Sequence, residues 1–241
     1  MTVLVTGGAG FIGAAVVSSL IESGEQVVCV DNFNDYYNPG LKRKRIELLG
    51  KKTNLKVVEI DIAETAAVNE LINSVKPKKV IHLAAQAGIR QASIDPHSYG
   101  RTNLFGFLNV IEASAKSGVE NFVFASTSSV YGSNTTTPFS ESHTATHPVS
   151  LYSATKIANE AIAHSYAATY GLACTGLRFF TVYGPWGRPD MALFTFTKQM
   201  LADETITVYN NGDMKRDFTY IDDIIESIFR LIPKPPVANL N

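Results

Sequence analysis

The strongest constraint on the fold is the alternation of short apolar runs with amphipathic stretches, which starts at the first residues of the chain. The apolar runs are predicted strands at residues 3–6, 26–31, 55–60, 79–83, 121–126 and 172–179. The amphipathic stretches are predicted helices at residues 12–23, 41–49, 63–75, 98–117 and 151–170. Strands with little polar alternation, separated by helices, are typical of a parallel sheet covered on both faces. We therefore predict a doubly wound α/β sheet of order 3-2-1-4-5-6, with a binding crevice beyond the carboxyl ends of its strands.

A glycine turn joins the first predicted strand to the first predicted helix. Gly7, Gly10 and Gly13 have the spacing G-x-x-G-x-x-G. Glycines let the backbone approach a pyrophosphate, and the helix N-terminus offers free N–H groups and a positive dipole end. Three glycines alone are weak support, but Asp31 closes the next strand at about the distance where an acidic residue meets the adenosine ribose. Because Asp31 would accept from a 2′-hydroxyl and repel a 2′-phosphate, we predict NAD rather than NADP in a Rossmann-type domain.

Two further charged features lie near this unit. Asp61 follows the third predicted strand and could reach the adenine edge, or equally cap the next helix. The basic run at residues 42–45 could mark a phosphate site. Apolar residues follow this run closely, so we interpret it as a solvated helix face.

The second chemical pattern is the pair Tyr152 and Lys156, which opens an alanine-rich predicted helix. Residues at i and i+4 share a helix face, so the phenol and the ammonium point the same way. A tyrosine acts as a base near neutral pH only if its pKa falls by about 3 from about 10, roughly 4 kcal/mol. A cation at a distance of about 4 Å supplies an energy of that size if the effective dielectric constant is about 20. We expect Lys156 also to bond the nicotinamide ribose, with the positive nicotinamide ring as a second contributor to the low pKa.

Hydroxyl groups at residues 126–129 follow the fifth predicted strand, in the predicted crevice. They can bond the substrate hydroxyl that is oxidised. For Ser126 we prefer a structural role, in which the turn satisfies its own backbone. Tyr131 is expected to be a packing residue.

Composition and spacing argue against several other functions. The net charge of −1 and the pI of about 6.5 give no general attraction to nucleic acid or an anionic membrane. Cys29 and Cys174 are expected to be buried free thiols. His143 and His147 have an H-x-x-x-H spacing without a third ligand, so no metal is predicted, and His82 is expected in the core. No signal peptide or transmembrane helix is visible, so we expect a cytoplasmic protein.

These motifs together resemble a known superfamily. Residues 7–13, 82–85 and 129–132, with Tyr152 and Lys156, are similar to the extended short-chain dehydrogenases/reductases that act on nucleotide sugars. More narrowly, residues 31–37, 85–90, 177–192 and 214–223 resemble the UDP-glucuronate 4-epimerase family.

The resemblance implies a mechanism and a set of contacts. Tyr152 takes the proton of the sugar 4-hydroxyl while hydride passes to NAD+, the 4-keto sugar turns, and hydride returns to its other face. Thr127 relays the proton and Lys156 holds the ribose. The implied cofactor contacts are Gly7, Gly10, Phe11, Ile12, Gly13, Asp31, Asn32, Asp61, Ile62, Leu83, Ala84, Ala85, Tyr152 and Lys156. The implied UDP-sugar contacts are Arg90, Asn103, Ser128, Ser129, Thr181, Arg188 and Arg216. Arg216 would grip the diphosphate, whereas Asn103 could instead be a buried amide that bonds backbone.

The choice among related reactions depends on residues 127–129, which carry hydroxyls only. Sugar-nucleotide dehydratases and UDP-glucuronate decarboxylases have an acidic residue in this stretch. Glucose/galactose epimerases more often have asparagine where Thr181 stands. Neutral donors also suit a substrate carboxylate, so the favoured reaction is 4-epimerisation of a UDP-hexuronate. A decarboxylase, a UDP-glucose 4-epimerase, a dehydratase and an inactive truncated NAD-binding fragment remain alternatives.

The pattern changes after residue 180. A turn-rich loop at 184–190 precedes a predicted helix at 191–202, a short strand at 206–209 and a helix at 221–231. We predict a Rossmann domain at 1–179 and a small, partial substrate lobe at 180–241, because members of the family continue further. An exposed apolar patch is expected where that further segment packs. The resemblance also implies a homodimer formed by the helices at 98–117 and 151–170.

Overall fold

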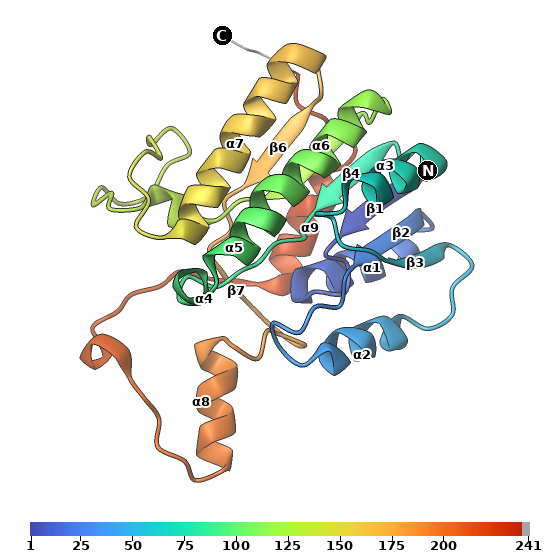
Figure 1. Ribbon diagram of the computed structural model, residues 1–241. Coiled ribbons are helices and arrows are strands. Elements are labelled where there is room, and N and C mark those ends of the chain that lie inside the picture. The colour runs from blue at the N-terminus through green and yellow to red at the C-terminus, as the bar shows by residue number, and fades with distance from the viewer. Residues whose placement is uncertain (238–241) are drawn as a thin grey trace.

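The computed structural model describes residues 1–237 and contains one six-stranded parallel sheet (Figure 1). Its strands are β1 (Thr2–Thr6), β2 (Gln26–Asp31), β3 (Leu55–Glu59), β4 (Lys79–His82), β5 (Asn121–Ala125) and β6 (Cys174–Leu177). The strand order is β3-β2-β1-β4-β5-β6, and all five pairings are parallel. The predicted order is therefore confirmed, and all six carboxyl ends lie at one edge of the sheet.

Helices cover both faces of the sheet because its strands are apolar on both sides. On one face, α1 (Phe11–Glu22) and α9 (Ile221–Leu231) pack against Val3 and Val5 of β1. On the other face, α3 (Thr65–Val75), α6 (Phe107–Lys116) and α7 (Leu151–Tyr170) belong to the layer built around Leu4. Successive residues of a strand point to opposite faces, so β1 contributes to both cores. Figure 1 shows α6 and α7 side by side in front of the sheet.

The predicted helix at residues 98–117 is a continuous helical run with an irregular centre. It consists of α5 (Pro96–Tyr99), a π-helix (Gly100–Gly106) and α6, and a short helix α4 (Gln91–Ile94) precedes it. Gly106, at the end of the π-helix, packs so closely that a Cβ there would stand 2.7 Å from the side chain of Ile62. Wider turns of this kind are rare and occur frequently at functional sites.

The chain leaves the sheet after β6 and returns to it with α9. β7 (Thr181–Tyr183) and β8 (Phe218–Tyr220) form a separate parallel pair, and α8 (Ala192–Leu201) lies between them in sequence. The predicted strand at 206–209 is wrong, because a short 3₁₀-helix (Tyr209–Gly212) starts there and β7 pairs with β8 instead. The domain boundary at 179/180 stays a prediction, and residues 238–241 of the predicted lobe lie outside the described residues.

Candidate active site

The glycine turn between β1 and α1 leaves no room for side chains. Gly7 has a φ of +68°, and a Cβ there would stand 2.6 Å from the backbone nitrogen of Ala84. A Cβ at Gly13 would collide with the carbonyl oxygen of Gly7. Gly10 is the N-cap of α1 and places no side chain over the first N–H groups of the helix. This bare helix N-terminus fits the pyrophosphate of a dinucleotide, which backbone N–H groups would hold.

Asp31 ends β2 beside this turn and is buried. Its carboxylate accepts hydrogen bonds from the backbone nitrogens of Ala9 at 3.2 Å and Phe33 at 2.9 Å. Lys42 of α2 (Pro39–Leu49) donates its Nζ to the same carboxylate at 3.3 Å. The carboxylate thus stands next to the glycine turn, which is where recognition of a ribose requires it.

The interpretation of the basic run in α2 as a solvated helix face is wrong for two of its members. Lys42 and Arg45 are buried, whereas Arg43 and Lys44 are exposed. Lys42 and Arg45 are three positions apart and therefore share one face of the helix. This face is turned toward the protein, because Lys42 meets Asp31 and Arg45 meets backbone carbonyl groups.

Tyr152 lies in the first turn of α7, whose start is fixed by a capping box. Its ring meets the ring of Tyr99 edge-on, with centroids 6.4 Å apart. Burial raises the pKa of Tyr152 above its ordinary value, and the charge of Arg188 and a hydrogen bond with Thr127 oppose this increase. The phenol is therefore protonated at neutral pH in this structure. It can become a base only when further positive charge enters the site.

Lys156 stands one helical turn after Tyr152 and is buried. Its Nζ donates to the carbonyl oxygen of Ala125, at the end of β5, at 2.8 Å. Burial lowers the pKa of Lys156 to about 8. The two side chains leave the same helix as predicted, but the cation that lowers the pKa of Tyr152 in this structure is Arg188.

Arg188 belongs to the turn-rich loop at residues 184–190. It donates to the carboxylate of Asp190 through Nε at 3.0 Å and Nη2 at 2.5 Å, and to the carbonyl oxygen of Ala87 at 3.4 Å. The hydroxyl of Tyr36 also donates to Asp190, at 3.0 Å. The loops after β2, β4 and β7 therefore converge beside Tyr152.

The hydroxyl groups after β5 divide into two sets. Thr127 begins a short 3₁₀-helix (Ser128–Tyr131), and its Oγ1 accepts from the backbone nitrogen of Ser129. Ser126 instead donates to Glu160 of α7, which also receives two hydrogen bonds from Arg178. The preferred interpretation, in which Ser126 bonds the backbone of its own turn, is therefore wrong, because its hydroxyl bonds a carboxylate of α7. Glu160 and Arg178 were missed, and the one-turn spacing of Glu160 from Lys156 is the signal that could have indicated Glu160.

Asn103 lies in the π-helix, and its side chain is already bonded. Its Oδ1 accepts from the backbone nitrogen of Gln86 at 2.8 Å. Its Nδ2 donates to the carbonyl oxygen of Gln86 at 3.0 Å and to Thr155 at 3.1 Å. These contacts favour the alternative of a buried amide that bonds backbone, and they fix the segment after β4 against α7.

Two predicted arginines lie apart from the cluster around Tyr152. Arg90 is exposed and stacks on the ring of Tyr209, with its guanidinium carbon 3.5 Å from the ring centroid. Arg216 is exposed and donates to the carbonyl oxygen of Lys215. Their contacts with a UDP-sugar stay predictions.

The predicted contacts around the third strand are mostly structural here. Asp61 accepts from the backbone nitrogen of Ala63 at 2.9 Å, and Glu64, not Asp61, is the N-cap residue of α3. Ile62 is buried in the core beside Gly106. Of the other predicted cofactor contacts, Asn32 accepts from the backbone of the loop after β2, Phe11 is buried, and Ile12, Leu83, Ala84 and Ala85 are half-buried.

The remaining sequence predictions concern buried groups. His82 lies in the core as expected, bonds Thr6 at 2.8 Å, and has its pKa lowered to about 3 by burial and by the charge of Lys156. Cys29 is a buried free thiol as expected, whereas the free thiol Cys174 is only partly buried. Tyr131 is a buried packing residue as expected.

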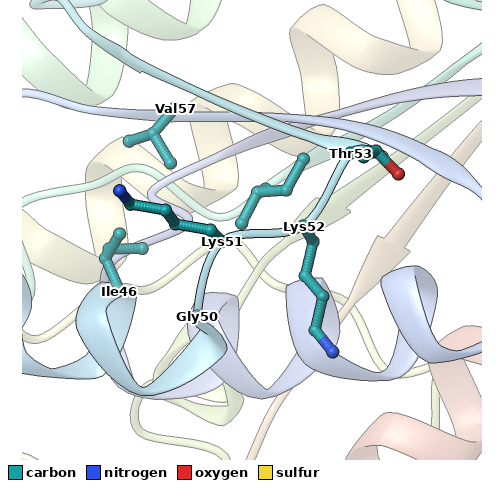
Figure 2. Close-up of a pocket in the computed structure, with 7 residues that line it drawn as sticks. Ile46, Gly50, Lys51, Lys52, Thr53 and Val57 are labelled. Carbon is teal, nitrogen blue, oxygen red and sulfur yellow. The ribbon is translucent and has the colours of Figure 1, made fainter.

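A shallow hollow of about 350 Å³ lies between α2 and β3 (Figure 2). Ile46, Lys51, Lys52 and Val57 are among the residues that line it, and none of its lining residues belongs to the predicted site. Within residues 1–237, no group of three metal-ligating side chains could hold a metal ion, and no helix of this part of the chain is long and apolar enough to cross a membrane.

Comparison with known proteins supports the same arrangement. The profile of the "NAD dependent epimerase/dehydratase family" matches residues 3–240. "Protein CapI" of Staphylococcus aureus is 48% identical over 239 residues, which are 99% of this chain and 71% of that protein. "UDP-glucuronate 4-epimerase 4" of Arabidopsis thaliana is 51% identical over 230 residues, 94% of this chain and 52% of the plant protein. The chain thus spans about half the length of this plant relative.

Solved structures give a similar result. The UDP-glucuronic acid 4-epimerase from Bacillus cereus, in complex with UDP-glucuronic acid and NAD, superposes with a TM-score of 0.91 and 35% identity, over 98% of this chain and 74% of that chain. A UDP-glucose 4-epimerase from Thermotoga maritima has a TM-score of 0.85 and 34% identity, over 94% and 72% of the two chains.

Proposed function

The chain belongs to the NAD dependent epimerase/dehydratase family, and from this premise we propose that it interconverts UDP-glucuronate and UDP-galacturonate by epimerisation at C4. The observation that carries the proposal is the convergence of Tyr152, Thr127 and Arg188 beside a glycine turn that fits a dinucleotide. The relatives named UDP-glucuronate 4-epimerases support the same reaction. NAD is the cofactor, because the family and the neighbouring structures use it.

The residues of the chain divide the work as follows. The glycine turn and Asp31 would hold NAD, which when bound would supply the acceptor and donor of the hydride at C4 of the sugar. Tyr152 accepts the proton of the 4-hydroxyl and later gives it back, and Thr127 hydrogen-bonds the phenol and relays that proton. Lys156, whose Nζ donates to the carbonyl oxygen of Ala125, brings a positive charge to the same helix face and would hold the ribose. Because burial raises the pKa of Tyr152, its ionisation requires positive charge beyond that of Arg188, which an oxidised nicotinamide ring would supply.

The choice of a uronate follows from the charges around Tyr152. Ser128, Ser129 and Thr181 provide neutral donors, which suit a substrate carboxylate. The acidic groups of Asp190 and Glu160 are engaged by Arg188 and Arg178. A dehydratase or decarboxylase would need an acid free to act on the substrate, so these alternatives have less support.

The direct test is incubation of the protein with NAD+ and UDP-glucuronate, followed by proton NMR. UDP-galacturonate should form and reach an equilibrium mixture without release of carbon dioxide. Interconversion of UDP-glucose, but not of UDP-glucuronate, would disprove the uronate assignment. Carbon dioxide release would indicate the decarboxylase, and loss of water from the sugar the dehydratase.

The homodimer is part of the proposal. Phe105 and Leu108 on the run from the π-helix to α6 are 66% and 38% exposed, and Leu151 at the start of α7 is 40% exposed. Apolar side chains on two adjacent helices form a surface that a second copy can cover. Light scattering should give twice the mass of the chain, and a monomer would contradict the assignment. A cytoplasmic location stays a prediction of the sequence.

A further inference from the structure

The loop that carries Arg188 begins with a strained turn at residues 184–187. The backbone nitrogen of Gly187 donates to the carbonyl oxygen of Gly184 at 3.2 Å, which closes a four-residue turn. Trp186, the third residue of this turn, has a φ of +62°. A proline followed by a residue with positive φ is the pattern of a type II turn, in which the third position is usually glycine. A tryptophan there is strained, so neighbouring contacts must hold it.

Arg45 supplies these contacts. Its Nε and Nη2 donate to the carbonyl oxygen of Trp186 at 3.1 and 2.7 Å, and Nη2 also approaches that of Gly187 at 3.3 Å. Its Nη1 donates to the carbonyl oxygen of Ala9 at 3.2 Å and to the hydroxyl of Tyr37 at 2.8 Å. The guanidinium therefore ties the glycine turn, the loop after β2 and the turn at 184–187 to one point.

The burial of Arg45 makes this arrangement unusual. Its side chain is only 3% exposed, and the partners named above are neutral carbonyl and hydroxyl groups. Removing a charge from water is expensive, so such a group is expected only where its rigid fork is fully used. Arg45 uses three nitrogen atoms to join segments 36 and 141 residues away from it in sequence.

The turn fixes the residue that follows it. Arg188 comes directly after Gly187, and its guanidinium lies against Asp190 and the carbonyl oxygen of Ala87, where its charge acts on Tyr152. If this turn could take another conformation, the backbone of Arg188 would move. The guanidinium of Arg188 would then change its position relative to Tyr152.

We propose that Arg45 is a positioning residue: by locking the turn at 184–187 to the glycine turn, it sets where Arg188 stands relative to Tyr152. This role rests on the proposed function, because positioning matters only if the site binds a nucleotide sugar. One side chain thus bonds both the glycine turn at Ala9 and the turn at residues 184–187.

Tryptophan fluorescence tests the anchor without enzyme activity, because Trp186 is the single tryptophan of the chain. In R45Q, loss of the anchor should shift the Trp186 emission and raise its quenching by acrylamide. The matched control is R43Q, which changes an exposed arginine of the same helix and should leave both properties as in the unchanged protein. R45Q with unchanged emission and quenching would overturn the proposal.

Kinetics supply the second measurement. R45Q should raise KM for UDP-glucuronate about tenfold, because it removes hydrogen bonds made by a charged group, while NAD+ affinity changes much less. If R45Q weakened NAD+ binding by a larger factor than it raised KM, the proposal would also be overturned, since Arg45 would then act mainly on the cofactor. R45K keeps the charge without the fork, and carries the test if R45Q does not fold. R45K should also raise KM, and an R45K protein with unchanged KM would show that the fork is not needed.

The proposed function and the positioning role of Arg45 can be disproved separately. If the unchanged protein does not turn over UDP-glucuronate, the proposed function fails. The fluorescence comparison of R45Q, R45K and R43Q then still decides whether Arg45 holds the turn.

Discussion

Helices α6 and α8 each have ten residues and similar mean hydropathy, yet they are packed in opposite ways. α6 buries five side chains, including Phe107, whereas α8, which lies wholly within the described residues, buries none. Leu193, Met200 and Leu201 of α8 are strongly exposed, and the predicted patch where a further segment of the family packs stays a prediction. The comparison teaches that the sheet and the helices packed on it form a core of their own, to which α8 does not contribute.

The largest expected effect comes from removing the hydroxyl oxygen of Tyr152, which lies in the predicted cofactor-binding domain at residues 1–179. Y152F should lower kcat by about two to four orders of magnitude, the usual contribution of a positioned acid or base. NAD+ binding and thermal stability should stay close to those of the unchanged protein, because the ring remains in place. Y170F is the matched control, since Tyr170 is an exposed tyrosine at the other end of α7. A Y152F protein with more than a tenth of the original kcat would contradict the assigned role.

A pair of phenylalanines tests the comparison of the helices directly. F107A removes a side chain with 0% exposure and should lower the free energy of unfolding by about 3–5 kcal/mol. F194A on α8 removes one that is 46% exposed and should lower it by less than about 1 kcal/mol. Urea denaturation of both variants measures the difference. Equal losses would show that α8 belongs to the same packed unit as α6.

The buried His82 makes the cofactor part sensitive to acid. Its pKa is lowered to about 3 in the folded protein, against about 6.5 when unfolded. As pH falls below about 6.5, the unfolded chain gains a proton that the folded chain refuses, so the free energy of unfolding falls, by about 3 kcal/mol on reaching about pH 4. In urea denaturation, the free energy of unfolding of H82N should fall less over this pH range, because asparagine takes up no proton. The same loss in both proteins would show that His82 does not control the acid response.

The smallest expected effect concerns the region after residue 180. R216Q should raise KM for UDP-glucuronate about tenfold, through loss of a contact between a charged donor and phosphate, with kcat changed little. K215Q, next to it in the same exposed segment, serves as control. A fall in kcat similar to that of Y152F would mean that Arg216 acts on the chemistry and not on binding.

The sequence was most informative where a pattern is local. The bounds of α7 and β2 were predicted as observed, because a capping serine and an acidic strand end mark them. The pairing of β7 with β8 was missed, since it joins residues 181–183 to residues 218–220. A strand was predicted at 206–209 from local alternation, although pairing, and not alternation, decides whether a strand forms.

The site shows the same limit. The glycine turn and the pair Tyr152 and Lys156 could be found from spacing alone. The burial of Arg45 could not, because its partners lie at Ala9 and Trp186, and a run of four basic residues looks solvated when only its neighbours in sequence are considered. The charge of Arg188 on Tyr152 likewise depends on a loop that is 36 positions further along the chain.

The capping box of α7 has a consequence for the catalytic proton. Ser150 and Ser153 bond each other's backbone, so the helix begins at a defined residue and Tyr152 occupies its second position. The aligned peptide dipoles of a helix place about half a positive charge at its first turn. Tyr152 therefore leaves the helix from the turn that carries this partial positive charge. A defined helix start thus keeps the catalytic tyrosine at one fixed position relative to the peptide dipoles of α7.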